Sequence, residues 1–125
     1  MREEVRNWLN QAEYDLSAAK DSFKTGHFEW ACFQSQQAAE KALKALYVHS
    51  IKRNIVTHDI VKIAEALDAP AEVKKLCRLI NSDYTVTRYP DAANGIPAEQ
   101  FDEDKANEHM NAAESILKWV KNFLK

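Results

Sequence analysis

Glycine and proline are scarce in this chain of 125 residues, which holds two glycines and three prolines. A fold of many short strands needs frequent tight turns, and these two residue types supply most of them. The chain also has no apolar run of 18 residues that would predict a membrane span, and no signal-peptide pattern. The sequence therefore predicts an all-α, cytoplasmic protein with long helices and no membrane association.

Cysteine is equally scarce, because only Cys32 and Cys77 occur and they lie far apart within apolar patterns. No Cys-x-x-Cys pair and no cysteine–histidine cluster of the kind that binds zinc is present. His27, His49 and His109 are scattered, without metal-ligand spacing to one another. We expect both thiols to be small core residues, and we expect no metal and no cofactor.

The net charge of −2 and the pI of about 6.1 exclude an overall basic character of the kind typical of nucleic-acid-binding domains. The charge is nevertheless uneven along the chain. Residues 41–90 carry nine lysines and arginines against five acidic residues, whereas the segments on either side are net acidic. The basic middle of the chain could form a local anion site.

Apolar residues recur every three to four positions along most of the chain, which is the period of an amphipathic helix. The pattern predicts long helices over residues 2–24 and 28–50, with Gly26 in the turn between them. A short turn between two such helices implies an antiparallel hairpin.

Shorter helices are predicted after the hairpin. Thr57 is expected to cap a helix over residues 58–67, and Asp68 is expected to cap the next one. The apolar stripe of that next helix extends to Tyr84 and tolerates Pro70 in its first turn.

Residues 85–101 form the one long segment without helical periodicity. Segments of this length in compact domains usually carry function or are disordered, and the aromatic residues here favour an ordered loop. The last helix is expected to start near Asp102, where acidic residues suit its N-terminal dipole. Together these elements predict one domain over residues 1–125, folded as an up-down bundle of four to five helices.

The first candidate site is the run Arg88-Tyr89-Pro90-Asp91, which follows Tyr84 closely. A proline pushes the preceding residue into an extended conformation, and this could present Arg88 as a planar donor for phosphate or carboxylate. The alternative is structural: Arg88 pairs with an aspartate and ties the loop to the bundle.

The second candidate is the pair Arg53 and His58, which reads as Arg-x4-His. An imidazole can act as a general base on a ribose hydroxyl near neutral pH. A nearby arginine would stabilise the charge that develops on the phosphorus centre. The alternative is that His58 only caps or anchors the short helix, with Asp59 near the start where the helix dipole favours an acidic residue.

The third candidate is the segment Gln36–Lys44, in which Gln37, Lys41 and Lys44 share one helical face, as do Gln36 and Glu40. The two lysines could meet a phosphate group. The alternative is a solvated face or a contact between subunits.

Four groups of residues, taken in order, resemble the HEPN domain family (higher eukaryotes and prokaryotes nucleotide-binding domain). They are Trp8 with Ala12 and Asp15-Leu16, the segment Phe33–Leu46, the run Thr57-His58-Asp59-Ile60, and Tyr84 with Arg88-Tyr89-Pro90-Asp91. They extend over nearly the whole chain, and the last of them indicates the branch with an Arg-Tyr-Pro-Asp loop.

This resemblance implies a helical bundle that forms homodimers. It also implies a minimal nucleotidyltransferase as partner, in a toxin–antitoxin-like system. Some branches are metal-independent ribonucleases that use an Arg-x4–6-His motif late in the domain. Here the only such spacing, Arg53 to His58, lies earlier, between the second and third helices.

The sequence thus predicts a HEPN-like module that binds a nucleotide or an RNA phosphate. The expected ligand-binding residues are Arg88, His58, Tyr84, Tyr89, Asp91, Lys41 and Lys44. Two alternatives stay open: a metal-independent ribonuclease that uses Arg53 and His58, and a purely structural dimerisation or interaction protein.

Overall fold

The computed structural model describes all 125 residues and contains helices and no strands. The helices are α1 (Glu3–Lys24), α2 (Phe28–Ile51), α3 (Ile60–Ala66), α4 (Ala71–Ile80), α5 (Asp83–Val86), α6 (Pro90–Ala93), α7 (Pro97–Gln100) and α8 (Glu103–Leu124). Helices α1, α2, α3, α4 and α8 have seven residues or more, and the other three have four each. The predicted all-α bundle is confirmed.

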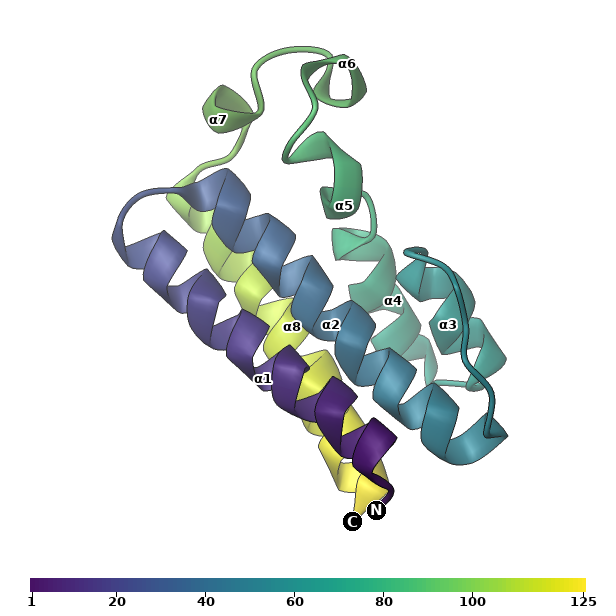
Figure 1. The fold of residues 1–125 in the computed structure, drawn as a ribbon. Helices are drawn as coiled ribbons and strands as arrows, with labels where there is room; N and C mark the ends of the chain where they lie inside the picture. Colours follow the sequence, from purple (N-terminus) through teal and green to yellow (C-terminus); the bar gives the residue numbers. More distant parts are fainter.

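Helices α1 and α2 form an antiparallel hairpin, and α8 packs along both of them (Figure 1). Helices α3 and α4 lie on the side of α2 away from α1, and α4 also contacts α8. The short helices α5, α6 and α7 sit at the end of the bundle opposite the two chain termini. No helix has both the length and the apolar character needed to cross a membrane.

Helix α2 runs through the centre of the bundle, and residues along most of its length are buried. Its alanines Ala38, Ala39 and Ala42 are fully buried and let neighbouring helices approach closely. Leu43 and Leu46 fill the space beside them within one large apolar cluster. The central helix thereby brings its polar residues against both α1 and the α3–α5 region.

The long helices agree with the sequence periodicity to within a residue or two. Residues 2–24 and 28–50 were predicted, and the helices span Glu3–Lys24 and Phe28–Ile51. Gly26 in the connecting turn has a φ of +79°, which a residue without a Cβ adopts without strain. Asp102 caps α8 by accepting a hydrogen bond from the Lys105 backbone N–H, as its predicted start requires.

The predicted caps in the middle of the chain are wrong. Asp59, not Thr57, is the N-cap of α3, because its carboxylate accepts from the backbone N–H groups of the two residues that follow Ile60. Asp68 has a φ of +54° and lies outside any helix, and the N-cap of α4 is Pro70. Asp and Asn residues tolerate this left-handed conformation, so Asp68 serves the turn instead.

The segment between α4 and α8 is also more regular than predicted. Tyr84 lies in the separate helix α5 and not at the end of α4. Residues 85–101 include α6 and α7, each of which starts with a proline at its first position. Proline fits there because its fixed φ suits a helix and the first N–H has no helical partner.

Candidate functional site

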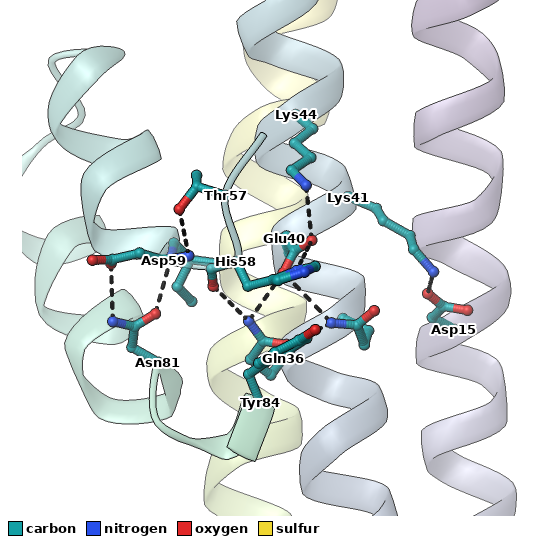
Figure 2. A network of polar contacts seen from close by, with 12 residues as sticks. Asp15, Gln36, Glu40, Lys41, Lys44, Thr57, His58, Asp59, Asn81 and Tyr84 are labelled. Atoms are coloured by element: carbon teal, nitrogen blue, oxygen red, sulfur yellow. Dashed lines mark hydrogen bonds and ion pairs between the residues drawn. The ribbon is translucent and has the colours of Figure 1, made fainter. Parts of the chain in front are cut away.

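His58 and Tyr84 come from different segments and stack face to face. Their ring centroids are 3.9 Å apart and their planes differ by 14°. The side chain of His58 remains 53% exposed. Asn81 connects the end of α4 to the start of α3. Its side chain accepts a hydrogen bond from the Ile60 backbone N–H at 2.9 Å and donates one to the Asp59 carboxylate at 3.0 Å (Figure 2).

Arg88 joins this stack from the turn after α5. Its guanidinium carbon lies 4.6 Å from the centroid of the Tyr84 ring, 4.4 Å from that of Phe33 and 4.8 Å from that of Tyr89. Its Nε donates to the Tyr84 carbonyl at 2.8 Å, and its Nη2 donates to the same oxygen. Arg88 pairs with no aspartate, so a guanidinium–aromatic cluster holds this turn. We refer to His58, Tyr84 and Arg88 as the cation–aromatic stack.

Glu40 on α2 orients the imidazole of His58. The Nδ1 atom of His58 lies 3.1 and 3.2 Å from the two carboxylate oxygens of Glu40. An ionised carboxylate only accepts hydrogen bonds, so Nδ1 carries a proton. The other ring nitrogen, Nε2, forms no hydrogen bond within the chain and belongs to a half-exposed side chain. Nε2 is therefore the atom of His58 that is available to a ligand.

The same carboxylate holds a buried ion pair. Lys44 Nζ lies 2.9 Å from Glu40, and the two side chains are 9% and 4% exposed. Gln36 donates to Glu40 at 3.4 Å and to the His58 carbonyl at 3.3 Å, which ties the loop before α3 to α2 (Figure 2). Lys44 thus serves as the counter-ion of Glu40, the residue that orients His58.

Lys41 faces α1 instead of the stack. Its Nζ lies 2.6 Å from Asp15, and the two side chains are only 23% and 14% exposed. Figure 2 shows the two lysines of this helical face directed to different acidic partners, Asp15 for Lys41 and Glu40 for Lys44. The structure therefore separates these predicted phosphate ligands and neutralises both.

Arg53 and Asp91 lie outside the network. Both are exposed, and neither side chain forms a hydrogen bond or an ion pair within the chain. Tyr89 is partly connected to the network. Its ring contacts the Arg88 guanidinium, and the residue is 48% exposed. Of the predicted residues, the structure thus brings His58, Tyr84, Arg88 and Tyr89 into one chain of contacts.

A surface hollow of about 250 Å³ lies beside Lys44, the basic partner of the Glu40–Lys44 ion pair. It is lined by Trp8, Lys44, Val48, Asn54, Ile55 and Val56. Lys44 Nζ lies 5.5 Å from the centre of the Trp8 ring, so the same ammonium touches the hollow and Glu40. The residues of the cation–aromatic stack line none of the surface hollows.

Behind Tyr84, the neighbouring Asp83 points into the bundle and contacts His109 of α8 through Nδ1. Burial raises the pKa of the Asp83 carboxyl, while the hydrogen bond and the charge of His109 oppose that rise. This pair attaches α5 to α8. No pattern in the sequence indicates the contact, because 26 residues separate the partners.

Glu40 and Phe33 are further site residues on α2. The sequence places Glu40 on a helical face with Gln36 but does not indicate its contact with His58. An acidic residue among the alanines of α2 was the available signal, since a buried carboxylate requires partners. No comparable signal distinguishes Phe33 from an ordinary core residue.

Comparison with known proteins finds matches along nearly the whole chain. The family model described as HEPN domain matches residues 5–123. A protein of Methanocaldococcus jannaschii named "Putative toxin MJ1304" is 30% identical over 133 residues, which cover 94% of this chain and 86% of that protein.

Two solved structures are similar along almost their whole length. ST0689, described as an archaeal HEPN homologue, is 37% identical with a TM-score of 0.86, and the match covers 99% of this chain and 100% of that one. TT1696 from Thermus thermophilus is 33% identical with a TM-score of 0.89, covering 97% and 98% of the two chains.

Proposed function

We propose that this chain, which belongs to the HEPN domain family, is a binding module for the phosphate of a nucleotide or of RNA. The observation that supports this proposal is the cation–aromatic stack. His58 and Arg88 come from segments 30 positions apart, and both contact the ring of Tyr84. A phosphate oxygen beside that ring would meet a donor from each of them.

Arg88 keeps donors free for such a ligand. A guanidinium carries five N–H groups, and the Tyr84 carbonyl takes donations from Nε and Nη2 only. The Nη1 amino group forms no hydrogen bond within the chain. It would donate to a phosphate oxygen, and the imidazolium form of His58, which carries a proton on both ring nitrogens, would donate to a second one through Nε2.

A nucleobase would have an aromatic surface available beside the phosphate. The half-exposed Tyr89 ring, which contacts Arg88, is that surface, and Tyr84 is already covered in part by His58. Stacking of this kind contributes about 1–3 kcal/mol per base and accepts any base. The proposed module therefore favours the nucleotide class over one particular base.

Calorimetric titration with ATP, GTP and AMP tests the proposal. The wild-type chain is expected to release or absorb heat with saturation, and His58→Ala and Arg88→Lys are expected to weaken binding at least several-fold. His49→Ala and Arg78→Ala are matched controls, because both residues are exposed and neither has an aromatic, ionic or hydrogen-bond contact with the stack. No heat at millimolar nucleotide, alone or with the partner described next, would refute the proposal.

The proposal includes a partner and a second copy of the chain. We expect a homodimer that acts in the cytoplasm with a minimal nucleotidyltransferase, in a toxin–antitoxin-like pair. The similarity to a protein whose name describes it as a putative toxin supports this context. Light scattering should give twice the 14.3 kDa of one chain, and affinity purification from the native host should recover a nucleotidyltransferase.

A metal-independent ribonuclease is the second candidate, and the contact between Glu40 and His58 favours it. A carboxylate on Nδ1 orients an imidazole so that Nε2 can take a proton from a ribose hydroxyl. Incubation of a labelled structured RNA without added metal tests this function. A ribonuclease of this kind should cleave the RNA as the wild type and lose cleavage in His58→Ala and in Arg53→Ala. Cleavage that persists in both purified variants would exclude these residues as the site.

A further inference from the structure

Three buried side chains of metal-binding type meet where α2, α5 and α8 come together. Cys32 comes from α2, Asp83 from α5 and His109 from α8. The thiol sulfur, a carboxylate oxygen and an imidazole nitrogen all lie within 4.8 Å of one another. The residues are 0%, 1% and 3% exposed, so bulk water does not solvate this cluster.

A buried cysteine, aspartate and histidine close together are unusual in a core built mainly of alanine, leucine and isoleucine. A buried carboxylate costs free energy unless charge or hydrogen bonds compensate for the lost water. Asp83 has one such partner, His109, and Cys32 makes no hydrogen bond to either of them. The second buried cysteine of the chain, Cys77, has no histidine and no carboxylate gathered around it in this way.

We propose that Cys32, Asp83 and His109 form a binding site for one divalent cation of borderline softness, with Zn²⁺ as the best match. Thiolate sulfur, imidazole nitrogen and carboxylate oxygen are the three ligand types that zinc accepts, whereas Mg²⁺ and Ca²⁺ take oxygen ligands. Three protein ligands leave one position of a tetrahedral ion for water.

Charge balance supports this choice of ion. Bound to the metal, Cys32 is a thiolate and Asp83 a carboxylate, and together they neutralise a doubly charged cation. The ion would replace the thiol proton and the hydrogen that His109 Nδ1 shares with Asp83. The buried cluster would then be neutral as a whole, which removes the cost of an isolated charge in the core.

Small side-chain movements complete the site. Zinc–ligand bonds of about 2.0–2.3 Å place neighbouring ligand atoms roughly 3.5 Å apart. The three ligand atoms, which now all lie within 4.8 Å of one another, therefore adjust to these distances, and the contact between His109 and Asp83 opens. Because Asp83 directly precedes Tyr84, the ion would also fix α5, the helix that supplies Tyr84 to the cation–aromatic stack.

Cobalt(II) titration of untagged protein tests the site directly. Co²⁺ occupies zinc sites, and a Co²⁺–thiolate bond gives a charge-transfer absorption that oxygen and nitrogen ligands do not. We expect one equivalent of Co²⁺ to bind wild-type protein with this absorption, and Zn²⁺ to displace it. We also expect Zn²⁺ to raise Tm by several degrees, because the ion binds the folded state alone.

Matched variants identify the ligands. Cys32→Ser and His109→Asn should lose the absorption, and Cys77→Ser should retain it, since Cys77 is an equally buried thiol outside the cluster. Circular dichroism checks that each variant folds, and Cys32→Ala replaces Cys32→Ser if the hydroxyl unfolds the core. No thiolate absorption in folded wild-type protein, or an absorption that survives loss of Cys32, would overturn the proposal. Nucleotide binding is measured separately, so this result does not depend on it.

Discussion

The imidazole of His58 lies flat on the phenol ring of Tyr84, 3.9 Å from centroid to centroid, although 26 positions separate the two residues. Glu40 holds the imidazole from α2, and Arg88 contacts the phenol ring from the following turn. The stack therefore joins three parts of the chain. Substitutions there are expected to affect both binding and stability, and the two effects can be measured separately.

Arg88→Ala is expected to lower the free energy of unfolding by about 2 kcal/mol. The substitution removes a charged hydrogen bond to the Tyr84 carbonyl and the guanidinium contacts with the aromatic rings. Urea unfolding followed by circular dichroism measures the change. Arg78→Ala, which removes an exposed arginine of α4, should change stability by less than about 0.5 kcal/mol.

The same comparison addresses the purely structural interpretation of the loop. If Arg88→Ala lowers stability while nucleotide affinity of the folded variant stays at the wild-type value, the arginine serves the fold alone. If stability is unchanged, the aromatic contacts described here do not hold the turn. We expect Arg88→Ala to lower both stability and nucleotide affinity.

Glu40→Leu is expected to destabilise the fold by about 3–5 kcal/mol, because it leaves the buried ammonium of Lys44 without a counter-ion. The double variant Glu40→Leu/Lys44→Met should be far more stable than the single variant, since it buries no unpaired charge. Thermal unfolding of both variants measures the difference. Equal losses in the single and double variants would show that the Lys44 charge is not buried as the structure has it.

A matched control for that pair lies on the surface. Glu13 of α1 pairs with Lys121 of α8, and both side chains are more than 40% exposed. Glu13→Ala should change the free energy of unfolding by no more than about 1 kcal/mol. The contrast separates the effect of burial from the effect of losing any ion pair.

Stability is expected to fall in alkaline solution because of the two buried thiols. Burial raises the pKa of Cys77 to about 12, and burial together with the charge of Asp83 raises the pKa of Cys32 well above its usual range. A thiol in the unfolded chain ionises near pH 8.5. Above that pH the unfolded state holds fewer protons than the folded state, so the free energy of unfolding decreases as pH rises.

Urea unfolding between pH 8 and pH 10 measures this decrease, up to about 1.4 kcal/mol per pH unit for each thiol. Cys77→Ala should show a shallower decrease than the wild type. Both thiols should also react slowly with Ellman's reagent until the chain unfolds. Rapid reaction of the folded protein, or an unchanged slope in Cys77→Ala, would contradict the buried thiols.

The long helices were predictable because their apolar period persists over more than 20 residues, and packing of such a face outweighs local preferences. The middle of the chain was less predictable. Thr57 and Asp59 are both good capping residues, and only the tertiary contact of Asn81 with Asp59 selects between them. Sequence periodicity also could not separate α5 from α4.

The spatial grouping of the candidate site residues was predictable only in part, for a similar reason. His58, Tyr84 and Arg88 stood out by residue type and resemblance, and they do converge. Whether a lysine is free for a ligand depends on which acidic residue lies across the interface, and the sequence does not show that Lys41 faces Asp15. His109 looked isolated for the same reason, since its partners lie on other helices.

Nuclear magnetic resonance of the histidine side chains during ATP titration tests the central claim most directly. The chain has four histidines, and the exposed His27 and His49 are internal controls. We predict that the ring signals of His58 shift and saturate with added ATP, while those of His27 and His49 stay in place. Unchanged His58 signals at millimolar ATP, or shifts confined to the other histidines, would contradict a phosphate site at the cation–aromatic stack.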